Sequence, residues 1–385
     1  MAEPPMRVLW LTENYPPSRG GMAQSCDRIV DGLRRRGTAV DVAHLTRSLA
    51  PGWTRTEQHH GLLLTAQLGD DPEHGMHRLW TTVRAEHSRS PYTHVVAFGG
   101  AYPIHAAPVY AAWLPAPLVT LLRGNDFDTG VFSLRRRASL LDALRASAAV
   151  GVVSADALGR VKALVPGTKV RVIHNGIDLS GWSTLPSERE RALGWRRANV
   201  APGRRSVGLI GQLKQKKGAL FFLDALATSG AAASFHVVLV GELEPAVREW
   251  LEGDAAAGCG LSWSEMPFLD RYELLGVFPA CDIVALPSFY DGLPNVALEA
   301  AGLGIPLLCS DAGGLAELVD EQIGFSFTAG DIDRARSSII AVAATTDDQL
   351  RALGREAARR VRKAYTSEAE VDGYTSLLSE VVSAR

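Results

Sequence analysis

The chain has 385 residues, which is more than one ordinary hydrophobic core needs and fits two domains. It is 46% hydrophobic and 21% charged, as globular proteins are, and its formal net charge of -2 excludes a general nucleic-acid binder. No apolar run approaches the roughly 20 residues of a membrane span, and no signal-peptide pattern is present. We therefore expect a soluble, cytoplasmic protein, with peripheral membrane contact left open.

The first part of the chain alternates short apolar strands with amphipathic helices. The run RVLWLT at 7–12 is continuously apolar, as expected for a strand covered on both faces. A helix over 22–36 follows and ends at Gly37, because glycine readily adopts the left-handed C-cap conformation. The alternation predicts a parallel sheet between helices. Its further strands are expected at 40–45, 94–98, 118–122, 149–153 and 170–174.

A polar, turn-rich stretch at 178–202 separates this part from a second alternation of the same kind. The sequence thus predicts an α/β protein with two doubly wound, Rossmann-like domains, residues 1–178 and 179–365. Ligands of such sheets bind beyond the carboxyl ends of the strands. Strands of the second domain are expected at 206–212, 236–240, 282–286 and 306–310. Helices are expected at 219–227, 245–251, 271–278, 295–303, 347–363 and 367–382.

The segment 286–302, LPSFYDGLPNVALEAAG, carries the most chemistry. A buried strand ends in a loop, and Pro294 suits the first turn of the helix that follows. Backbone N–H groups at 293–296 would form an anion site suited to a diphosphate. Asp291 in the loop and Glu299 on the helix can accept hydrogen bonds from the hydroxyls of a sugar and a ribose. The alternative is a solvated loop with an ordinary surface glutamate.

Here the sequence resembles a known family. Asp291 and Glu299 resemble the E-x7-E motif of the retaining GT-B glycosyltransferases of family GT4, the glycosyl transferases group 1. The form DGLPNVALEA is similar to the family's EGLPNVLLEA. The resemblance implies the GT-B fold, with two Rossmann-like domains facing a central cleft. It also implies that residues 366–385 pack back on the first domain as a C-terminal helix.

The segment 208–218, GLIGQLKQKKG, resembles the family's G-R-L-x-x-x-K-G, whose arginine and lysine hold the donor phosphates. Lys217 stands at the lysine position. Gln212 replaces the arginine, and this departure removes one positive charge. Lys214 and Lys216 are the candidate substitutes, although a lysine lacks the planar fork of arginine. Considered alone, the segment suits a solvated lysine cluster in a turn.

Further matches are shorter. Gly20-Gly21 resembles the YPPxxGG loop near the family's N-terminus, and two glycines let the backbone approach a ligand. His174-Asn-Gly-Ile-Asp178 resembles the NGVD segment at the interdomain linker, and Gly313-Gly314 resembles a glycine pair near the donor. The family histidine after an earlier strand is missing from VAFGGAYP at 96–103.

The segment Arg123-Gly-Asn125-Asp126 follows an apolar strand and resembles the family's HGSD, with arginine in the histidine position. The resemblance implies that Arg123, Asn125 and Asp126 face the acceptor or the transferred sugar. A capping loop in which Asp126 is a structural acceptor is an equal alternative. Asp126 and Asp128 also spell DxD, a metal motif of a different glycosyltransferase fold, and we assign no metal to them.

The resemblance implies transfer of a hexose from a nucleotide-diphosphate sugar to a hydroxyl acceptor, with retention and without a metal or cofactor. Asp291 would orient the sugar, Lys217 would stabilise the leaving diphosphate, and Glu299 would hold the ribose. The acceptor is a small molecule, a glycan or a lipid-linked saccharide. The implied donor site comprises Gly20, Gly21, Gln212, Lys217, Asp291, Gly292, Leu293, Pro294, Asn295, Val296 and Glu299.

Two other functions fit the same architecture. A nucleotide-sugar 2-epimerase would need paired acid and base groups around the sugar C2, and the sequence reveals none. A non-catalytic sugar-binding protein would explain Gln212 and the missing histidine, but Asp291, Lys217 and Glu299 argue against it. Product analysis without acceptor separates an epimerase from a transferase. A nicotinamide dehydrogenase is a weaker third alternative, because no G-x-G-x-x-G follows a predicted strand.

Overall fold

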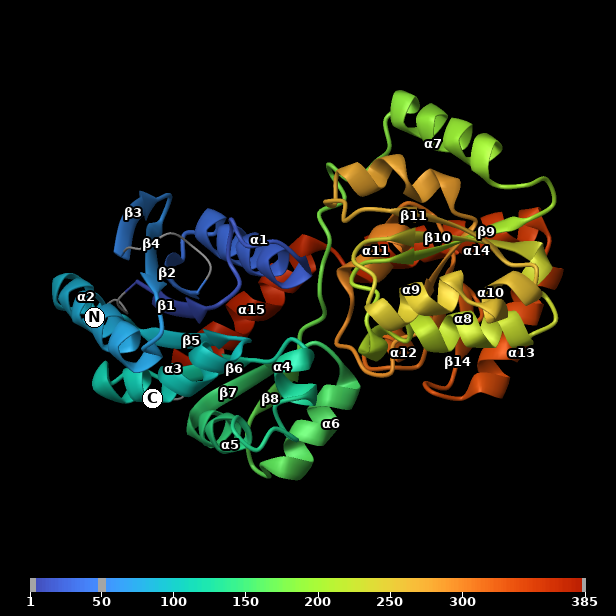
Figure 1. Ribbon diagram of the computed structural model, residues 1–385. Coiled ribbons are helices and arrows are strands. Elements are labelled where there is room, and N and C mark those ends of the chain that lie inside the picture. Colours follow the sequence, from blue (N-terminus) through green and yellow to red (C-terminus); the bar gives the residue numbers. More distant parts are fainter. Residues whose placement is uncertain (1–4, 48–52, 383–385) are drawn as a thin grey trace. The chain divides into compact units, whose positions relative to one another are not determined.

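The computed structural model of the chain describes residues 5–47 and 53–382 (Figure 1). The chain divides into two compact units. Unit 1 comprises Met1–Asn175 and Ser367–Arg385, and unit 2 comprises Gly176–Thr366. The division therefore falls between Asn175 and Gly176, slightly before the boundary after Asp178 that the sequence suggested.

Within the described residues, unit 1 holds an eight-stranded sheet in the order β3-β4-β2-β1-β5-β6-β7-β8. All neighbouring strands are parallel except the antiparallel pair β3 and β4. The sequence did not predict β3 and β4, which lengthen the sheet beyond β2. The strands are β1 Arg7–Thr12, β2 Ala39–Thr46, β3 Trp53–Gln58, β4 Gly61–Gln67, β5 His94–Phe98, β6 Leu118–Leu121, β7 Ser147–Val152 and β8 Val170–Val172.

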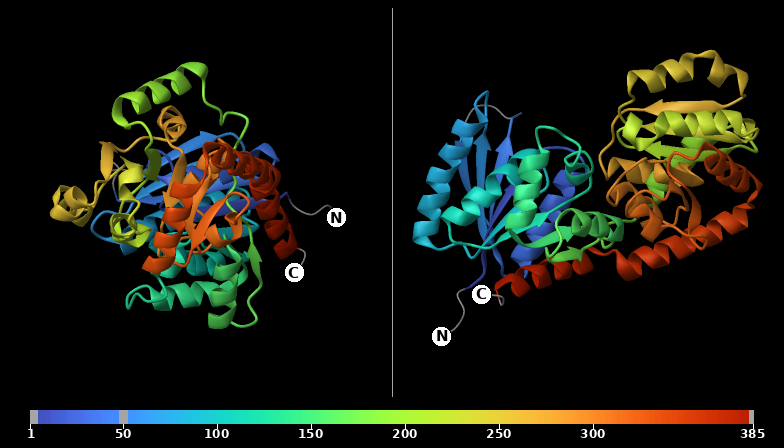
Figure 2. Two further views of the ribbon diagram at one scale, coloured as in Figure 1. Left: turned by 90° about the vertical axis from the view of Figure 1, so that its right-hand side faces the viewer. Right: turned by 90° about the horizontal axis from the view of Figure 1, so that it is seen from below.

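The helices of unit 1 include one from the far end of the chain. Helix α15 packs beside α1 (Figure 2). A Cβ on Gly32 of α1 would overlap Val371 of α15, so glycine permits this close approach. Val371, Tyr374 and Leu377 join the core cluster of β1 and α1. The helices are α1 Gly21–Arg35, α2 Pro72–Arg89, α3 Ala101–Trp113, α4 Asn125–Asp128, α5 Arg137–Ala146, α6 Ala155–Leu164 and α15 Ser367–Val382.

Within the described residues, unit 2 holds a six-stranded, all-parallel sheet in the order β11-β10-β9-β12-β13-β14. This is the doubly wound order, in which the direction of winding reverses between the first strand, β9, and the fourth, β12. The four inner strands β10, β9, β12 and β13 are almost entirely buried, as expected for a sheet covered on both faces, whereas the edge strands β11 and β14 are partly exposed. They are β9 Arg205–Ile210, β10 Phe235–Val240, β11 Ser262–Met266, β12 Ile283–Leu286, β13 Leu307–Ser310 and β14 Gly324–Phe327.

The helical segments of unit 2 correct one prediction. The helix expected at 271–278 is wrong: two 3-10 turns, η3 and η4, occupy this region, and Pro279 lies within the second. The α-helices are α7 Pro186–Asn199, α8 Ala219–Thr228, α9 Pro245–Glu252, α10 Asp254–Gly258, α11 Asn295–Gly302, α12 Leu315–Leu318, α13 Ile332–Ala344 and α14 Asp347–Ala364. The 3-10 turns are η1 Gln215–Lys217, η2 Ala232–Ser234, η3 Glu273–Gly276 and η4 Phe278–Ala280.

No helix in the described part of the chain combines the length and the apolar character that a membrane crossing requires.

Candidate functional site

The topology of unit 2 brings the two informative segments together. Strands β9 and β12 are parallel neighbours, with Val207 opposite Ile283, so both chains leave the sheet at the same edge. The lysine-rich segment begins at Gly211, directly after β9, and the Asp291 loop follows β12. This edge is the switch point of the sheet, where open α/β sheets bind their ligands.

The loops after β9 and β12 are locked against each other. Gly218 has a φ of +68°, and a Cβ at this position would overlap the carbonyl oxygen of Pro287. The backbone N–H of Phe289 donates to the carbonyl of Lys216 at 2.9 Å. Glycine is therefore required at the end of the motif, because the second loop lies against its backbone.

The loop after β13 supports the Asp291 loop from the other side. Gly313 has a φ of +53°, and a Cβ there would overlap the carbonyl oxygen of Asp291. The N–H of Gly314 donates to the carbonyl of Gly292 at 2.6 Å. The glycine pair that the sequence related to the donor site thus holds the backbone of Asp291 in place.

The structure brings Lys217 and Asp291 into an ion pair between Nζ and Oδ2. The Oγ of Ser288 also donates to Oδ2 of Asp291, at 3.3 Å. The side chains of Lys217 and Asp291 are 30% and 14% exposed, so both can be reached by a ligand. The two residues that the sequence analysis named as catalytic therefore form one polar cluster at the switch point.

Helix α11 begins at Asn295, with Pro294 as its N-cap. Proline has no N–H, so the anion site expected from four consecutive N–H groups loses the one at Pro294. Glu299 lies one turn into the helix and is only 6% exposed. Its backbone carbonyl accepts a hydrogen bond from Nε1 of Trp182 at 2.9 Å, which fixes the chain after the linker against α11.

Gln212, which replaces the family arginine, and Lys216, one of its proposed substitutes, differ in their surroundings. Gln212 is exposed, and its carbonyl accepts a hydrogen bond from the N–H of Lys214 at 2.9 Å. The ammonium of Lys216 lies 5.7 Å from the ring centre of Tyr290 in the neighbouring loop, a cation–π contact. Lys216 is thus held against the neighbouring loop, whereas Gln212 lies at the surface.

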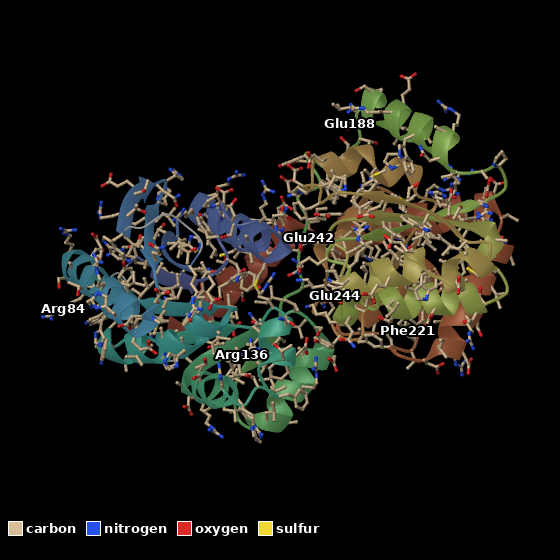
Figure 3. The ribbon with its side chains drawn as sticks, in the orientation of Figure 1. Arg84, Arg136, Glu188, Phe221, Glu242 and Glu244 are labelled. Carbon is tan, nitrogen blue, oxygen red and sulfur yellow. The ribbon has the colours of Figure 1, made fainter. Side chains whose placement is uncertain are left out.

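The sequence analysis missed the support that the loop after β10 gives to the lysine-rich loop. Figure 3 labels Glu242 and Glu244 in this loop. The carbonyl of Glu242 accepts from the N–H of Leu213 at 2.9 Å, and Oε2 of Glu244 accepts from the N–H of Gln215 at 2.7 Å. In the sequence, only the two glutamates of GELEP could have indicated that this loop binds the lysine-rich loop, and such a pattern is weak evidence.

In unit 1, Gly20 occupies the N-cap of α1 with a φ of +107°, which favours glycine. Gly21 is the first residue of α1.

The sequence analysis missed Glu13 in the loop that follows β1. Its Oε1 accepts from the N–H of Tyr102 at 2.5 Å, at the start of α3. Burial raises the pKa of Glu13, against the effect of the N–H groups of Tyr102 and Ala101.

Arg123 does not lie where the resemblance placed it. Its side chain is 4% exposed, and the guanidinium donates to the Tyr374 hydroxyl and to Oδ1 of Asn175. Oε1 of Glu370, also fully buried, lies 3.5 Å away. Burial raises the pKa of Tyr374 to about 12, so the hydroxyl stays neutral. Arg123 thus joins the loop after β6 to α15 and to the end of unit 1, and in this structure an acceptor does not reach it.

The two aspartates of the DxD sequence also have partners within unit 1. Both carboxylate oxygens of Asp126 accept from the N–H of Arg123 at 3.0 Å, as the capping-loop alternative requires. Burial raises the pKa of Asp126. Asp128 pairs with Arg160 at 2.7 Å, and Asn125 begins α4. Among the described residues, no three His, Cys, Asp or Glu side chains are grouped so that they could hold a metal ion.

Comparison with protein families gives one match in each half of the chain. Residues 19–180 match the model described as Glycosyltransferase Family 4. Residues 204–345 match the model described as Glycosyl transferases group 1. The first match covers most of unit 1 and extends into the first residues of unit 2, and the second lies within unit 2.

The chain is also similar to curated proteins. It is 28% identical to the glycogen synthase of Mycobacterium tuberculosis over 276 residues, which are 69% of this chain and 62% of that protein. The match thus spans less than two thirds of that relative's length. It is 27% identical to the alpha-maltose-1-phosphate synthase of the same organism over 349 residues, 86% of each chain.

Solved structures share the fold. The sucrose-phosphate synthase of Thermosynechococcus elongatus superimposes with a TM-score of 0.78 at 18% identity, covering 99% of this chain and 100% of that one. Anabaena HepE in complex with UDP-glucose gives a TM-score of 0.74 at 20% identity, with coverages of 99% and 100%. The two family matches, the fold and the motifs at the switch point of unit 2 together identify the chain as a glycosyltransferase with the GT-B fold.

Proposed function

We propose that the chain transfers a hexosyl group from a nucleoside-diphosphate sugar to a hydroxyl acceptor, with retention of configuration and without a divalent metal. The observation that carries the proposal is the Lys217–Asp291 ion pair at the switch point of unit 2. The pair combines a cation for a diphosphate with a carboxylate for sugar hydroxyls. The acceptor binds to unit 1, which carries most of the match to Glycosyltransferase Family 4 at residues 19–180.

The ion pair suggests how the donor enters the site. Without donor, Lys217 neutralises Asp291. A donor diphosphate competes for the ammonium of Lys217, and its sugar hydroxyls donate to the carboxylate of Asp291, which then exchanges one partner for another. Ser288 continues to hold Oδ2 of Asp291 during this exchange. Charged hydrogen bonds of this kind are short and strong, and they orient the sugar for transfer.

Negative charge develops on the leaving diphosphate as the bond between the anomeric carbon of the sugar and the diphosphate oxygen breaks. Lys217 lies on the loop after β9, and the first turn of α11 follows the loop after β12. Because these two loops are fixed against each other, the groups that stabilise the diphosphate need to move little during the reaction. These groups supply the stabilisation for which other enzymes use a metal ion. Asp126 and Asp128, the alternative metal ligands, are engaged by the N–H of Arg123 and by Arg160.

Retention follows from a front-face displacement, which is the mechanism that the family resemblance implies. The acceptor hydroxyl attacks the anomeric carbon from the side that the diphosphate leaves, and a departing phosphate oxygen takes the hydroxyl proton. The bond from carbon to the phosphate oxygen breaks as the new glycosidic bond forms. No protein nucleophile is needed, so Asp291 only orients the sugar.

UDP-glucose is the first donor to test, because the solved structure of Anabaena HepE contains it and a similar Escherichia coli protein is named a UDP-Gal-dependent galactosyltransferase. Calorimetry with UDP-, GDP-, ADP- and dTDP-sugars should show binding of one nucleotide class. Lys217→Met should weaken that binding, whereas Lys363→Met, which changes an exposed lysine of α14 in the same unit, is the control. Turnover should persist in EDTA, and NMR of the product should show the donor's anomeric configuration. Loss of turnover in EDTA that manganese restores, or an inverted product, would contradict the proposal.

A further inference from the structure

Two large apolar side chains of unit 1 lie almost entirely in solvent. Phe132 is 88% exposed and Leu134 is 102% exposed, and both belong to the turn between α4 and α5. Across the described residues, no other large apolar side chain is more than 64% exposed. Isolated exposed apolar residues are ordinary, but a pair of this size at full exposure is a sign of an interaction site.

The turn is ordered by its own hydrogen bonds. The N–H of Ser133 donates to the carbonyl of Gly130 at 3.1 Å. The N–H groups of Arg136 and Arg137 donate to the carbonyl of Ser133 at 3.2 and 2.9 Å. Val131 packs against the core beside α5, whereas Phe132 and Leu134 are exposed to solvent. The exposure of Phe132 and Leu134 is therefore a property of a built turn.

Three consecutive arginines follow the apolar pair. Arg135, Arg136 and Arg137 are all exposed, and Figure 3 labels the second of them. Nη2 of Arg136 donates to Oγ1 of Thr129 at 3.1 Å. In the part of the chain that the structure describes, no acidic side chain forms an ion pair with any of the three, although the charge of Arg136 acts to lower the pKa of Glu13. By contrast, Arg145 on the next helix pairs with Asp142 at 3.7 Å.

We infer that this turn docks on an anionic lipid bilayer, with Phe132 and Leu134 entering the interface and Arg135–Arg137 contacting the headgroups. Apolar side chains flanked by unpaired cations are the combination that binds such surfaces, since burial and electrostatic attraction add. A protein partner fits less well, because the cores of protein interfaces are depleted of charge. The inference does not depend on which sugar is transferred.

The test uses the full chain and sedimentation with lipid vesicles. The wild-type protein should bind vesicles that contain phosphatidylglycerol and should bind vesicles of pure phosphatidylcholine much less. Raising the salt concentration should release it from the anionic vesicles. The double variant Phe132→Ala, Leu134→Ala should lower the partition coefficient about tenfold or more. The triple variant Arg135→Ala, Arg136→Ala, Arg137→Ala should lose binding and its salt dependence. The control is Val109→Ala with Trp113→Ala, which removes two partly exposed apolar side chains of the same unit.

A local probe separates docking from general loss of structure. Phe132→Cys, labelled with an environment-sensitive dye, should show a blue shift with anionic vesicles only. Donor binding by each variant should match the wild type, since the turn lies outside unit 2. The inference is overturned if the wild type stays in solution with anionic vesicles, or if the double variant binds them equally well. Concentration-dependent dimerisation that the same variant abolishes would also overturn it, because the turn would then bind a second copy.

Discussion

The buried guanidinium of Arg123 gives the sharpest test of the structure. Replacement by methionine, Arg123→Met, keeps an unbranched, apolar stem and removes the guanidinium with its charge and its hydrogen bonds. If Arg123 anchors α15, the change should loosen this helix. If Arg123 instead contacts an acceptor, as the sequence resemblance implied, the change should raise the acceptor KM and leave stability almost unchanged.

The size of the effect follows from the partners of Arg123. Its guanidinium contacts Tyr374, Asn175 and Glu370, and lies 5.1 Å from the ring centre of Phe98. Removing one member of a buried ion pair costs about 3–5 kcal/mol. Glu370 keeps Arg28 as a partner at 2.8 Å, so we expect the lower end, about 3 kcal/mol.

Hydrogen exchange measures this quantity locally. The N–H groups of α15 should exchange about a hundredfold faster in Arg123→Met, since each 1.4 kcal/mol is a factor of about ten. The matched control is Arg35→Met on α1, whose exposed pair with Asp31 should be worth less than about 1 kcal/mol. Unchanged exchange in α15 together with a raised acceptor KM would refute the anchoring role.

Three further predictions concern charge. Asp291→Asn and Lys217→Met should each lower kcat about a hundredfold or more, measured with the donor that calorimetry identifies, and wild-type turnover in either would remove the pair from the mechanism. Burial raises the pKa of Asp126 above its ordinary value of 3.8, so the folded state holds this proton more tightly than the unfolded state. The free energy of unfolding should therefore fall as pH rises from 3.8 towards the folded pKa, and Asp126→Asn should flatten this slope in urea titrations at several pH values. Gln212→Arg should leave the melting temperature unchanged, because Gln212 is exposed, and should lower kcat, because a neighbouring lysine already supplies the charge and the guanidinium crowds the site; a raised kcat would show that phosphate neutralisation limits the chemical step.

Much of the fold could be predicted because its strands are continuous apolar runs. The expected bounds of β1 and β5 agree with the structure at both ends. The edge strand β3, WTRTEQ, could not be recognised, since it is mostly exposed and carries no apolar repeat. The apolar spacing of ELLGVF fits an α-helix and a 3-10 helix equally well. The structure has the short 3-10 turns η3 and η4 here, and Pro279 lies within the second of them.

The candidate site was predictable where it depends on neighbouring residues and not where it depends on distant ones. Lys217 and Asp291 were identified from two local motifs, and the parallel pairing of β9 with β12 explains why they meet. The role of Arg123 was not predictable, because Asn175 and Glu370 lie 52 and 247 residues away in the sequence. Burial of an arginine depends on such partners, and a single sequence does not reveal them.

The position of α15 has a consequence for synthesis on the ribosome. Residues 176–366 form unit 2 and are translated before α15, which completes unit 1. Val371, Tyr374 and Leu377 belong to the same core cluster as Trp10, so nascent unit 1 exposes part of that core until α15 is made. Domains generally fold in the order of their translation. In this chain we expect the reverse order: unit 1, which is translated first, completes its core only after unit 2 has been made.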